Sequence, residues 1–358
     1  MKKTIAIVQP VIPDYREPLF SALADIYGHQ LHVYAGSSAA RATIPSAADD
    51  RSYFRRLDNR HFVKNRLLWQ SGYEEELLEA DLVIASGTLR TLSTLCLLAR
   101  RRGRRPTILW GHVHGRHSSL GVARRSMLKA SDGFLSYTET DALVARSVLP
   151  ANRVWSANNS CVWAKDCQTQ AEAIPKNVLY VGRLVVEKKP GVLLEAFALL
   201  AARGSVPGDA RLMFVGDGPL RTSLEGRAAE LGVRDRVMFY GPVWKPQDLW
   251  PLYDSALVAT SPGYVGLSAI QAFARGVTFV VSRDEPHSPE IEACQEGFNT
   301  VFFDTDSAGH LATVLVSCFA TSAELLGRRP AIAAAIATRY TYDNMVHAFR
   351  CAIDTFIP

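Results

Sequence analysis

The sequence predicts an α/β protein made of two doubly wound parallel sheets. Short apolar runs rich in Val and Ile alternate with longer segments of helical periodicity through all 358 residues, a pattern typical of parallel sheets covered by helices. Both halves of the chain repeat this alternation. Because single hydrophobic cores stop growing at about 250 to 300 residues, a chain of this length is expected to form two domains.

In the first half, each predicted strand is a short apolar run, and each predicted helix is an amphipathic segment between two such runs. The predicted strands are Thr4–Val8, Gln30–Tyr34, Asp81–Ala85, Thr107–Trp110, Gly133–Tyr137 and Val154–Ala157. The predicted helices are Glu17–Ile26, Thr91–Arg101 and Leu120–Ala130.

The second half follows the same scheme after a polar linker over residues 163–176. The predicted strands are Val178–Val181, Arg211–Val215, Val237–Tyr240, Ala256–Ala259, Thr278–Val281 and Thr300–Phe302. The predicted helices are Gly191–Ala202, Pro219–Leu231, Leu267–Arg275 and Ala308–Leu326. We therefore expect one domain over residues 1–165 and a second over residues 174–338.

The composition, 48% hydrophobic and 21% charged, is that of a globular protein and excludes a disordered or coiled-coil chain. No apolar run approaches the roughly 18 residues that span a membrane, and the first residues lack the features of a secretion signal. We expect a cytoplasmic protein. The six cysteines form no Cys-x-x-Cys pair, and no zinc-site spacing is present, so we expect reduced thiols and no bound metal.

Positive charge is concentrated in the first half, where residues 1–165 carry 23 Lys and Arg against 14 Asp and Glu. Two dense groups lie in residues 51–66 and 100–105. Nucleic acid, an anionic membrane surface and a phosphorylated substrate would all be attracted. Nucleic acid is disfavoured, because no zinc-finger spacing or RNP-type motif accompanies the charge. The run 100–105 alone is better explained as a solvated helix end.

The strongest chemical motif is a buried strand, Val178–Val181, that runs directly into Gly182 and Arg183, with Lys188 five residues further on. Glycine lets a ligand approach the backbone closely, and a guanidinium with an ammonium can neutralise a diphosphate. A solvated loop with two surface cations is the alternative. Two further turns, residues 216–219 and 241–243, each follow a strand and are ordinary turns when taken alone.

In this order and spacing, the three segments resemble the retaining glycosyltransferases of family 4, which have the GT-B fold of two Rossmann-like domains facing a central cleft. The resemblance is specific over residues 177–300 and thin elsewhere. It implies that Arg183 and Lys188 hold the diphosphate of a nucleotide sugar and act in catalysis. It also implies that the donor contacts Gly182, Gly216 and Val243, and that the closing helix over residues 341–358 packs back on the first domain.

This sequence departs from the family at its pair of glutamates, where Gly263 and Gln271 stand instead. The amide of Gln271 can still bind a ribose hydroxyl, whereas Gly263 contributes only backbone. Gly266 and Leu267 open a helix, and their amides can bind a phosphate oxygen. Glu290 or Glu292 is a less favoured source of the missing carboxylate.

Three residues of the first half are candidates for the sugar and acceptor. His112 follows the strand Thr107–Trp110, where family members often carry a histidine near the donor sugar, so we assign it to catalysis. A structural histidine is the alternative. His114 and His117 compete for the sugar contact, and His114 with Arg116 could equally bind an acceptor phosphate. The proline-rich loop after the first strand would present Tyr15 and Arg16 rigidly to the acceptor; helix capping and surface packing are equally favoured there.

Together, these features predict a metal-independent, retaining hexosyltransferase without a cofactor. It would move a sugar from a nucleoside-diphosphate sugar to a glycan or a lipid-diphosphate-linked acceptor in cell-envelope polysaccharide synthesis. An anionic membrane surface is a predicted partner, which gives peripheral attachment at the inner face. A non-catalytic GT-B subunit that binds a nucleotide sugar or stabilises a partner is the alternative. A nicotinamide dehydrogenase is disfavoured, because no glycine stands between Thr4 and Tyr27.

Overall fold

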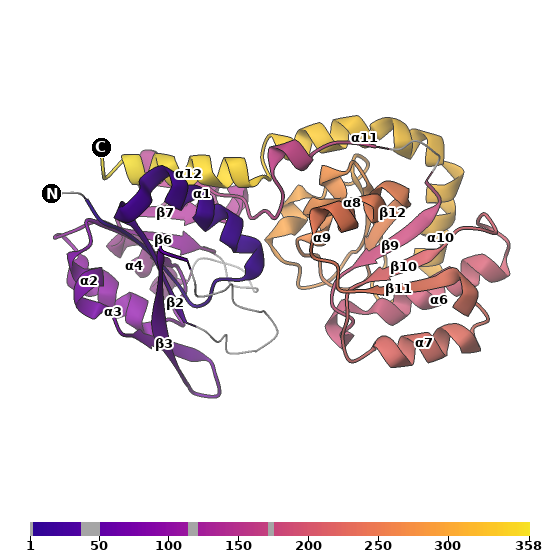
Figure 1. Cartoon of the computed structure of the whole chain (residues 1–358), viewed down its shortest axis with the longest axis horizontal. Coiled ribbons are helices and arrows are strands. Elements are labelled where there is room, and N and C mark those ends of the chain that lie inside the picture. The colour runs from indigo at the N-terminus through magenta and orange to yellow at the C-terminus, as the bar shows by residue number, and fades with distance from the viewer. Residues whose placement is uncertain (1–2, 37–50, 114–120, 171–174) are drawn as a thin grey trace. The chain divides into compact units, whose positions relative to one another are not determined.

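A computed structural model describes residues 3–36, 51–113, 121–170 and 175–358 (Figure 1). The chain divides into two compact units. Unit 1 comprises Met1–Asn159 with Tyr342–Pro358, and unit 2 comprises Ser160–Thr341. The first unit thus ends before the predicted limit at residue 165, and the second begins before the predicted limit at residue 174. The C-terminal segment joins unit 1.

Unit 1 is built on an eight-stranded sheet in the order β4-β3-β2-β1-β5-β6-β7-β8. All neighbours are parallel except β3 and β4, which form an antiparallel hairpin. The strands are β1 Ile5–Gln9, β2 Leu31–Gly36, β3 Phe54–Phe62, β4 Leu67–Ser71, β5 Leu82–Ser86, β6 Thr107–Gly111, β7 Gly133–Ser136 and β8 Val154–Ser156. The α-helices are α1 Glu17–Tyr27, α2 Glu74–Glu79, α3 Leu92–Arg101, α4 Val122–Ala130, α5 Glu139–Ala145 and α12 Tyr342–Asp354.

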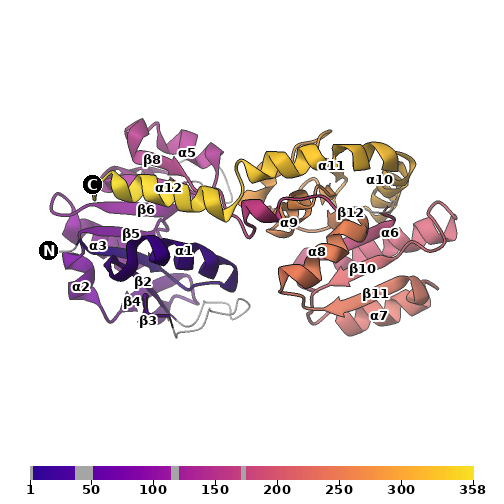
Figure 2. The ribbon, with the colours of Figure 1, turned by 45° about the horizontal axis from the view of Figure 1, so that its top comes forward.

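The C-terminal helix α12 completes the core of unit 1. It lies beside α1, as Figure 2 shows. Phe349 is fully buried and meets the ring of Trp110 edge-on, with 4.8 Å between ring centroids. The hydroxyl of Tyr342 donates a hydrogen bond to the carbonyl of Tyr15. The last helix therefore fixes the backbone of the loop that follows β1.

Unit 2 is built on a six-stranded parallel sheet in the order β11-β10-β9-β12-β13-β14. This is the strand order of a Rossmann fold. The strands are β9 Asn177–Val181, β10 Leu212–Val215, β11 Val237–Gly241, β12 Ala256–Ser261, β13 Thr278–Ser282 and β14 Thr300–Phe303. The α-helices are α6 Pro190–Ala202, α7 Arg221–Glu230, α8 Pro246–Ser255, α9 Ser268–Ala274, α10 Ala308–Ala320 and α11 Ser322–Ala337.

Every predicted strand is present, with its ends placed to within two residues. Runs of Val, Ile and Leu buried on both faces identify such strands, and β1, β6 and β13 are buried along their whole length. The prediction of one helix over residues 308–326 is wrong, because the chain leaves helical geometry at Thr321 (φ −105°, ψ 22°), between the end of α10 and the start of α11 at Ser322. The pattern also missed β3, β4, α2, α5 and α8.

A buried ion pair joins two helices of unit 2. Arg275, which follows α9, donates to both carboxylate oxygens of Asp254 in α8, at 2.9 and 2.8 Å. The Arg275 side chain is 5% exposed, so this bidentate pair lies away from water. Among the described residues, no single helix is long and apolar enough to cross a membrane; one bent pair, residues 308–320 with 322–354, passes that test by length and composition.

Candidate functional site

The loops after β9 and β12 meet in unit 2. These strands are neighbours whose following chains run to opposite sides of the sheet, and doubly wound sheets bind ligands at this switch point. The amide of Gly263, in the β12 loop, donates to the carbonyl of Lys188, in the β9 loop, at 3.1 Å. The two loops are thus joined backbone to backbone, and they carry Arg183, Lys188 and Tyr264.

The predicted glycines hold three successive loops against one another. Gly182 donates to the carbonyl of Val215 at 2.9 Å, and Gly216 donates to that of Gly241 at 2.7 Å. Gly216 has φ +132°, and a Cβ there would lie 2.0 Å from the carbonyl oxygen of Gly182. Only glycine fits this position. Val243, just beyond, packs against the core of unit 2.

Tyr264 contacts both predicted diphosphate ligands. Nη2 of Arg183 donates to the Tyr264 hydroxyl at 3.0 Å. Nζ of Lys188 donates to the Tyr264 carbonyl at 2.7 Å and lies 3.5 Å from the centre of its ring. The structure therefore brings Arg183 and Lys188 together, as predicted, around a tyrosine that the sequence did not single out.

The ammonium of Lys188 is partly removed from water. Burial, with a smaller contribution from the charge of Arg183, lowers its pKa to about 8, against the opposing effect of Glu290. Two cations near one point repel each other unless an anion lies between them. The site is consequently electropositive and suited to a ligand with two adjacent negative charges.

The position of the family's first glutamate has no room for a side chain. A Cβ on Gly263 would lie 2.4 Å from the carbonyl oxygen of Glu187 and 2.8 Å from Cα of Lys188, both main-chain atoms. At Gly266, by contrast, a Cβ would be at an ordinary 3.5 Å from Nζ of Lys188. Glycine at residue 263 is therefore what lets the two loops touch.

Gln271 lies in α9, at the position of the family's second glutamate. Its Oε1 accepts a hydrogen bond at 3.1 Å from the hydroxyl of the fully buried Tyr253. This contact orients the amide, whose NH₂ group is a donor. Gly266 and Leu267 immediately precede the helix, and their contact with a phosphate stays a prediction.

The segment that leads into Glu290 forms hydrogen bonds with the β12 loop. Nδ1 of His287 accepts from the amide of Val265 at 3.0 Å, and the amide of Ser288 donates to the Val265 carbonyl at 3.2 Å. Glu290 follows, 3% exposed. Its charge opposes the lowering of the Lys188 pKa, so this carboxylate acts on the site electrostatically.

In unit 1, His112 directly follows β6 and is held by an acid. Its Nδ1 lies 3.0 Å from Oδ2 of Asp141, whose side chain is 7% exposed while that of His112 is 41% exposed. Asp141 lies in the first turn of α5, which is capped by Thr138. Sequence reasoning missed Asp141, although Thr-x-x-Asp is a helix-start signal. The imidazole ring is thus oriented and still open to solvent.

The expected presentation of Arg16 at the surface is wrong. Its side chain is 7% exposed, and the guanidinium lies over the rings of Trp110 and Tyr137, at 4.4 and 4.7 Å from their centres. Three neighbouring aromatic residues make this stacking favourable and draw the arginine inward. Tyr15 is half-buried beside it. His114, Arg116 and His117 lie outside the described residues.

The run 100–105 is also more than a solvated helix end. Arg101 is 1% exposed and donates to the carbonyls of Leu77, Leu78 and Pro106 and to the hydroxyl of Thr107. It ties α3 to the neighbouring elements of unit 1, a structural role. Arg105 pairs with Asp81 at 2.7 Å.

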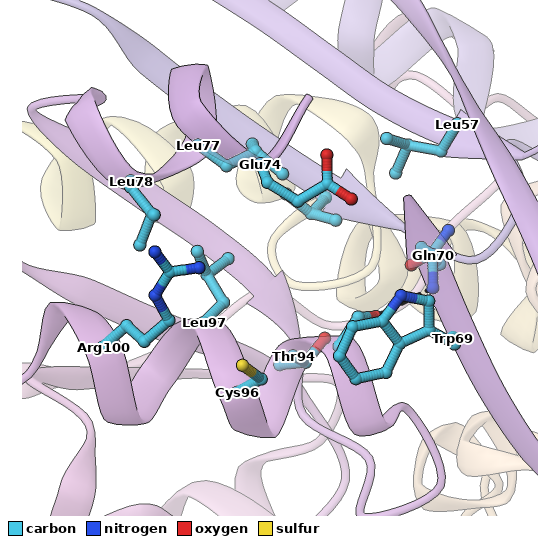
Figure 3. Close-up of a pocket in the computed structure, with 12 residues that line it drawn as sticks. Leu57, Trp69, Gln70, Glu74, Leu77, Leu78, Thr94, Cys96, Leu97 and Arg100 are labelled. Carbon is cyan, nitrogen blue, oxygen red and sulfur yellow. Dashed lines mark hydrogen bonds between the residues drawn. The ribbon is translucent and has the colours of Figure 1, made fainter. Parts of the chain in front are cut away.

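A mostly apolar pocket lies in unit 1 between α2, α3 and the hairpin strands (Figure 3). Leu57, Leu77 and Leu97 form its walls, and the ring of Trp69 borders it. No predicted site residue lines this pocket. Within the described parts of the chain, no group of three or more His, Cys, Asp or Glu side chains is placed to hold a metal ion.

Comparison with known families places the predicted donor residues in a recognised domain. Residues 165–318 match the family model described as Glycosyl transferases group 1. All of the matched residues lie in the second unit. The match includes the loops with Arg183, Lys188 and Tyr264, so the switch-point site lies inside it.

Solved structures resemble the chain over nearly its whole length. The structure of HepE from Anabaena with UDP has a TM-score of 0.66 and 16% identity, and the match covers 99% of this chain and all of that one. The lipopolysaccharide outer core galactosyltransferase WaaB has a TM-score of 0.68 and 16% identity, over 98% and 99% of the two chains. The two-domain fold is GT-B, as predicted.

Curated relatives match the chain over shorter stretches. A GDP-mannose-dependent phosphatidylinositol dimannoside mannosyltransferase of Mycobacterium tuberculosis is 39% identical over 116 residues, which are 31% of this chain and 29% of the relative. A D-inositol 3-phosphate glycosyltransferase of Mycolicibacterium vanbaalenii is 32% identical over 193 residues, 51% and 42% of the two chains. The matched stretches span less than half of these relatives.

Proposed function

We propose that this chain is a retaining glycosyltransferase that moves a hexose-type sugar from a nucleoside-diphosphate sugar to a glycan or lipid-linked acceptor in cell-envelope polysaccharide synthesis. The observation that carries the proposal is the meeting of Arg183 and Lys188 at the switch point of the glycosyl transferases group 1 domain. The names of relatives, which mention GDP-mannose and UDP, support a nucleotide-linked donor.

In this proposal, Arg183 and Lys188 bind the diphosphate and stabilise the charge that develops on it as the sugar leaves. Such fixed charges act on the transition state with little reorganisation. Gln271, oriented by Tyr253, would donate to a ribose hydroxyl. The resemblance further suggests front-face attack, in which the leaving phosphate takes the proton of the acceptor hydroxyl.

His112 would contact the donor sugar from unit 1. Oδ2 of Asp141 as a hydrogen-bond acceptor for Nδ1 of His112 favours the tautomer in which Nδ1 carries the proton and Nε2 accepts. A neutral imidazole held this way can accept a hydrogen bond from a sugar hydroxyl. Asp141 is then a positioning residue.

The test is ligand-induced stabilisation combined with slow donor hydrolysis. The purified protein is incubated with UDP-, GDP-, dTDP- and ADP-sugars, and both the shift in melting temperature and the release of free nucleotide are measured. A shift with one nucleotide series, with nucleotide release, both lost in Arg183→Ala, supports the proposal. No shift with any donor would contradict donor binding. Arg211→Ala, a change in the same unit outside the site, is the matched control.

A non-catalytic role is the second candidate, and one observation favours it. The main-chain packing at Gly263 leaves no space for the glutamate that would touch the donor sugar. A binding subunit would show the melting shift without nucleotide release, even when glycolipid acceptors are added. Release of free nucleotide that depends on His112 would instead support a transferase.

The acceptor and the place of action are also proposals. A lipid-diphosphate acceptor would hold the enzyme at the inner face of a membrane, and the basic first half of the sequence suits an anionic surface. Dense positive charge near such a surface gives reversible attachment without a spanning helix.

A further inference from the structure

The hairpin of β3 and β4 extends past the strand beside it. β2 ends at Gly36, which pairs with Leu57, whereas β3 continues for five more residues to Phe62. The chain then turns through residues 63–66 and returns as β4, which pairs with the extension of β3. Figure 1 shows the hairpin projecting from the rest of the sheet. We refer to residues 60–67 as the hairpin tip.

Two large apolar side chains are exposed side by side at the tip. Phe62 is 48% exposed and Val63 is 63% exposed. In the described part of unit 1, the other large apolar side chains with such exposure, Ile26, Val122 and Leu143, are isolated from one another in the sequence. An adjacent exposed pair at the end of a projection is well placed to enter an apolar phase.

The backbone of the tip is strained in a way that displays these side chains. Val63, Lys64 and Asn65 have φ values of 50°, 52° and 64°, the left-handed region. A β-branched residue such as valine is disfavoured there. Strain of this kind concentrates at functional sites.

Strand register places apolar and cationic side chains on one face of the hairpin. Arg60 pairs with Trp69, and Phe62 pairs with Leu67. Directly paired residues, and residues two apart in a strand, share a face. On the other face, Leu68 and Gln70 are buried against unit 1. On this face Arg60 and Phe62 are exposed and Leu67 is half-buried, and the half-buried Trp69 borders the apolar pocket of Figure 3.

Cations surround the exposed pair. Arg60, Lys64 and Arg66 are exposed and have no ion pair among the described residues. The hairpin contains one acid, Asp58, at the base of its extension. Apolar side chains at the centre of a positive rim match the interface of an anionic bilayer, where acyl chains lie beneath phosphate headgroups.

We propose that the β3–β4 hairpin tip binds an anionic lipid bilayer, with Phe62 and Val63 entering the interface and Arg60, Lys64 and Arg66 contacting lipid phosphates. The inference rests on the peripheral attachment in the proposed function and assigns it to one element. Within the basic group 51–66 it leaves out Arg55, whose guanidinium donates to the carbonyls of Ser52 and Phe54.

A second basic surface of unit 1 is the competing site. A hollow lined by Arg100, Arg102, Arg104 and Arg105 lies at the end of α3. It has positive charge but no large exposed apolar side chain among the described residues that line it. It could attract a bilayer by charge alone, so the test must separate the two surfaces.

The test is flotation of the full chain with vesicles of phosphatidylcholine alone or mixed with phosphatidylglycerol. We expect binding to the anionic vesicles only. Arg60→Gln, Lys64→Gln and Arg66→Gln combined should lower the partition coefficient by about a hundredfold at low salt, from about 1 kcal/mol per cation. Val63→Gly, which suits a positive φ and preserves the fold, should lower it several-fold. Phe62→Ser with Val63→Ser should lower it further.

Matched controls keep the outcomes separate. Leu143→Ser, an exposed apolar residue of unit 1, should bind like the wild type. If Arg100→Gln with Arg102→Gln and Arg104→Gln abolishes binding while the tip variants retain it, the arginine-lined hollow is the site and the proposal is overturned. Absence of binding by the wild type also overturns it. Nucleotide-induced melting shifts of the tip variants report donor binding separately, so failure of the proposed function would be recognised independently.

Discussion

The hydroxyl of Tyr264 accepts a hydrogen bond from Nη2 of Arg183 at 3.0 Å. The phenol thus occupies a donor of the guanidinium that a diphosphate would use. Because the Tyr264 carbonyl also accepts from Lys188, one residue engages both cations. A nucleotide that binds both cations competes with these contacts.

Tyr264→Phe should therefore tighten nucleoside-diphosphate binding. The change removes the hydroxyl that competes for Arg183 and keeps the ring over Lys188. A net hydrogen bond of about 1 kcal/mol corresponds to a Kd about fivefold lower, measured by calorimetry. Tyr27→Phe, which removes a phenol bonded to Asp354 in unit 1, should leave Kd unchanged. Weaker binding by Tyr264→Phe would instead mean that the phenol contacts the bound nucleotide.

Nucleotide affinity should fall as the pH rises above about 8. Burial lowers the pKa of Lys188 to about 8, and a bound diphosphate would raise it, because it stabilises the ammonium. Binding therefore takes up a proton above this pH, and affinity is full below it. The loss is at most about tenfold per pH unit. Lys188→Arg, which stays charged, should remove this dependence. A flat profile in the wild type would contradict the assignment of Lys188.

Restoring the family's glutamate should damage the site. In Gly263→Glu, the new Cβ meets main-chain atoms of Glu187 and Lys188 at 2.4 and 2.8 Å, so the β9 and β12 loops must separate. We expect nucleotide affinity to drop by an order of magnitude or more, from strain of about 1 to 3 kcal/mol. Gly266→Ala, with an ordinary 3.5 Å contact, is the control and should bind normally. Unchanged binding in Gly263→Glu would show that the loops are free to part.

Arg275→Ala should destabilise unit 2 strongly. Removing this arginine leaves the carboxylate of Asp254, 16% exposed, without its bidentate partner. The expected loss in the free energy of unfolding is about 3 to 5 kcal/mol, measured by denaturant titration. Arg283→Ala breaks an exposed pair with Glu296 and should leave the free energy of unfolding almost unchanged, because solvent screens such a pair. Equal losses in the two variants would contradict the importance of burial.

The strands could be predicted because parallel strands buried on both faces are continuous apolar runs. The β3–β4 hairpin could not be predicted in this way. The sequence of β3 is Phe-Arg-Arg-Leu-Asp-Asn-Arg-His-Phe, and its charged residues interrupt the apolar run expected of a buried strand. Its stability comes from pairing with β2 and β4, which is a tertiary effect. Likewise, α8 contains Pro251, a residue that argues against a helix.

The cations of the site were predicted from one loop, but their partner was not. Tyr264 lies far from Arg183 in sequence, and the two meet only because β9 and β12 are neighbours in the sheet. The order of the strands in a sheet cannot be inferred from the hydrophobic periodicity of the individual segments. For the same reason Asp141, which holds His112 from α5, needed the structure to be found.

The return of α12 to unit 1 makes that unit discontinuous in the chain, with the whole of unit 2 inserted between Asn159 and Tyr342. During synthesis, unit 2 is therefore complete before Phe349 can reach Trp110. Until then, the apolar surface of unit 1 that α12 covers, including Trp110, stays exposed. Unit 2 is continuous, so it is the part that can fold first, whereas unit 1 is completed only after α12 has been made.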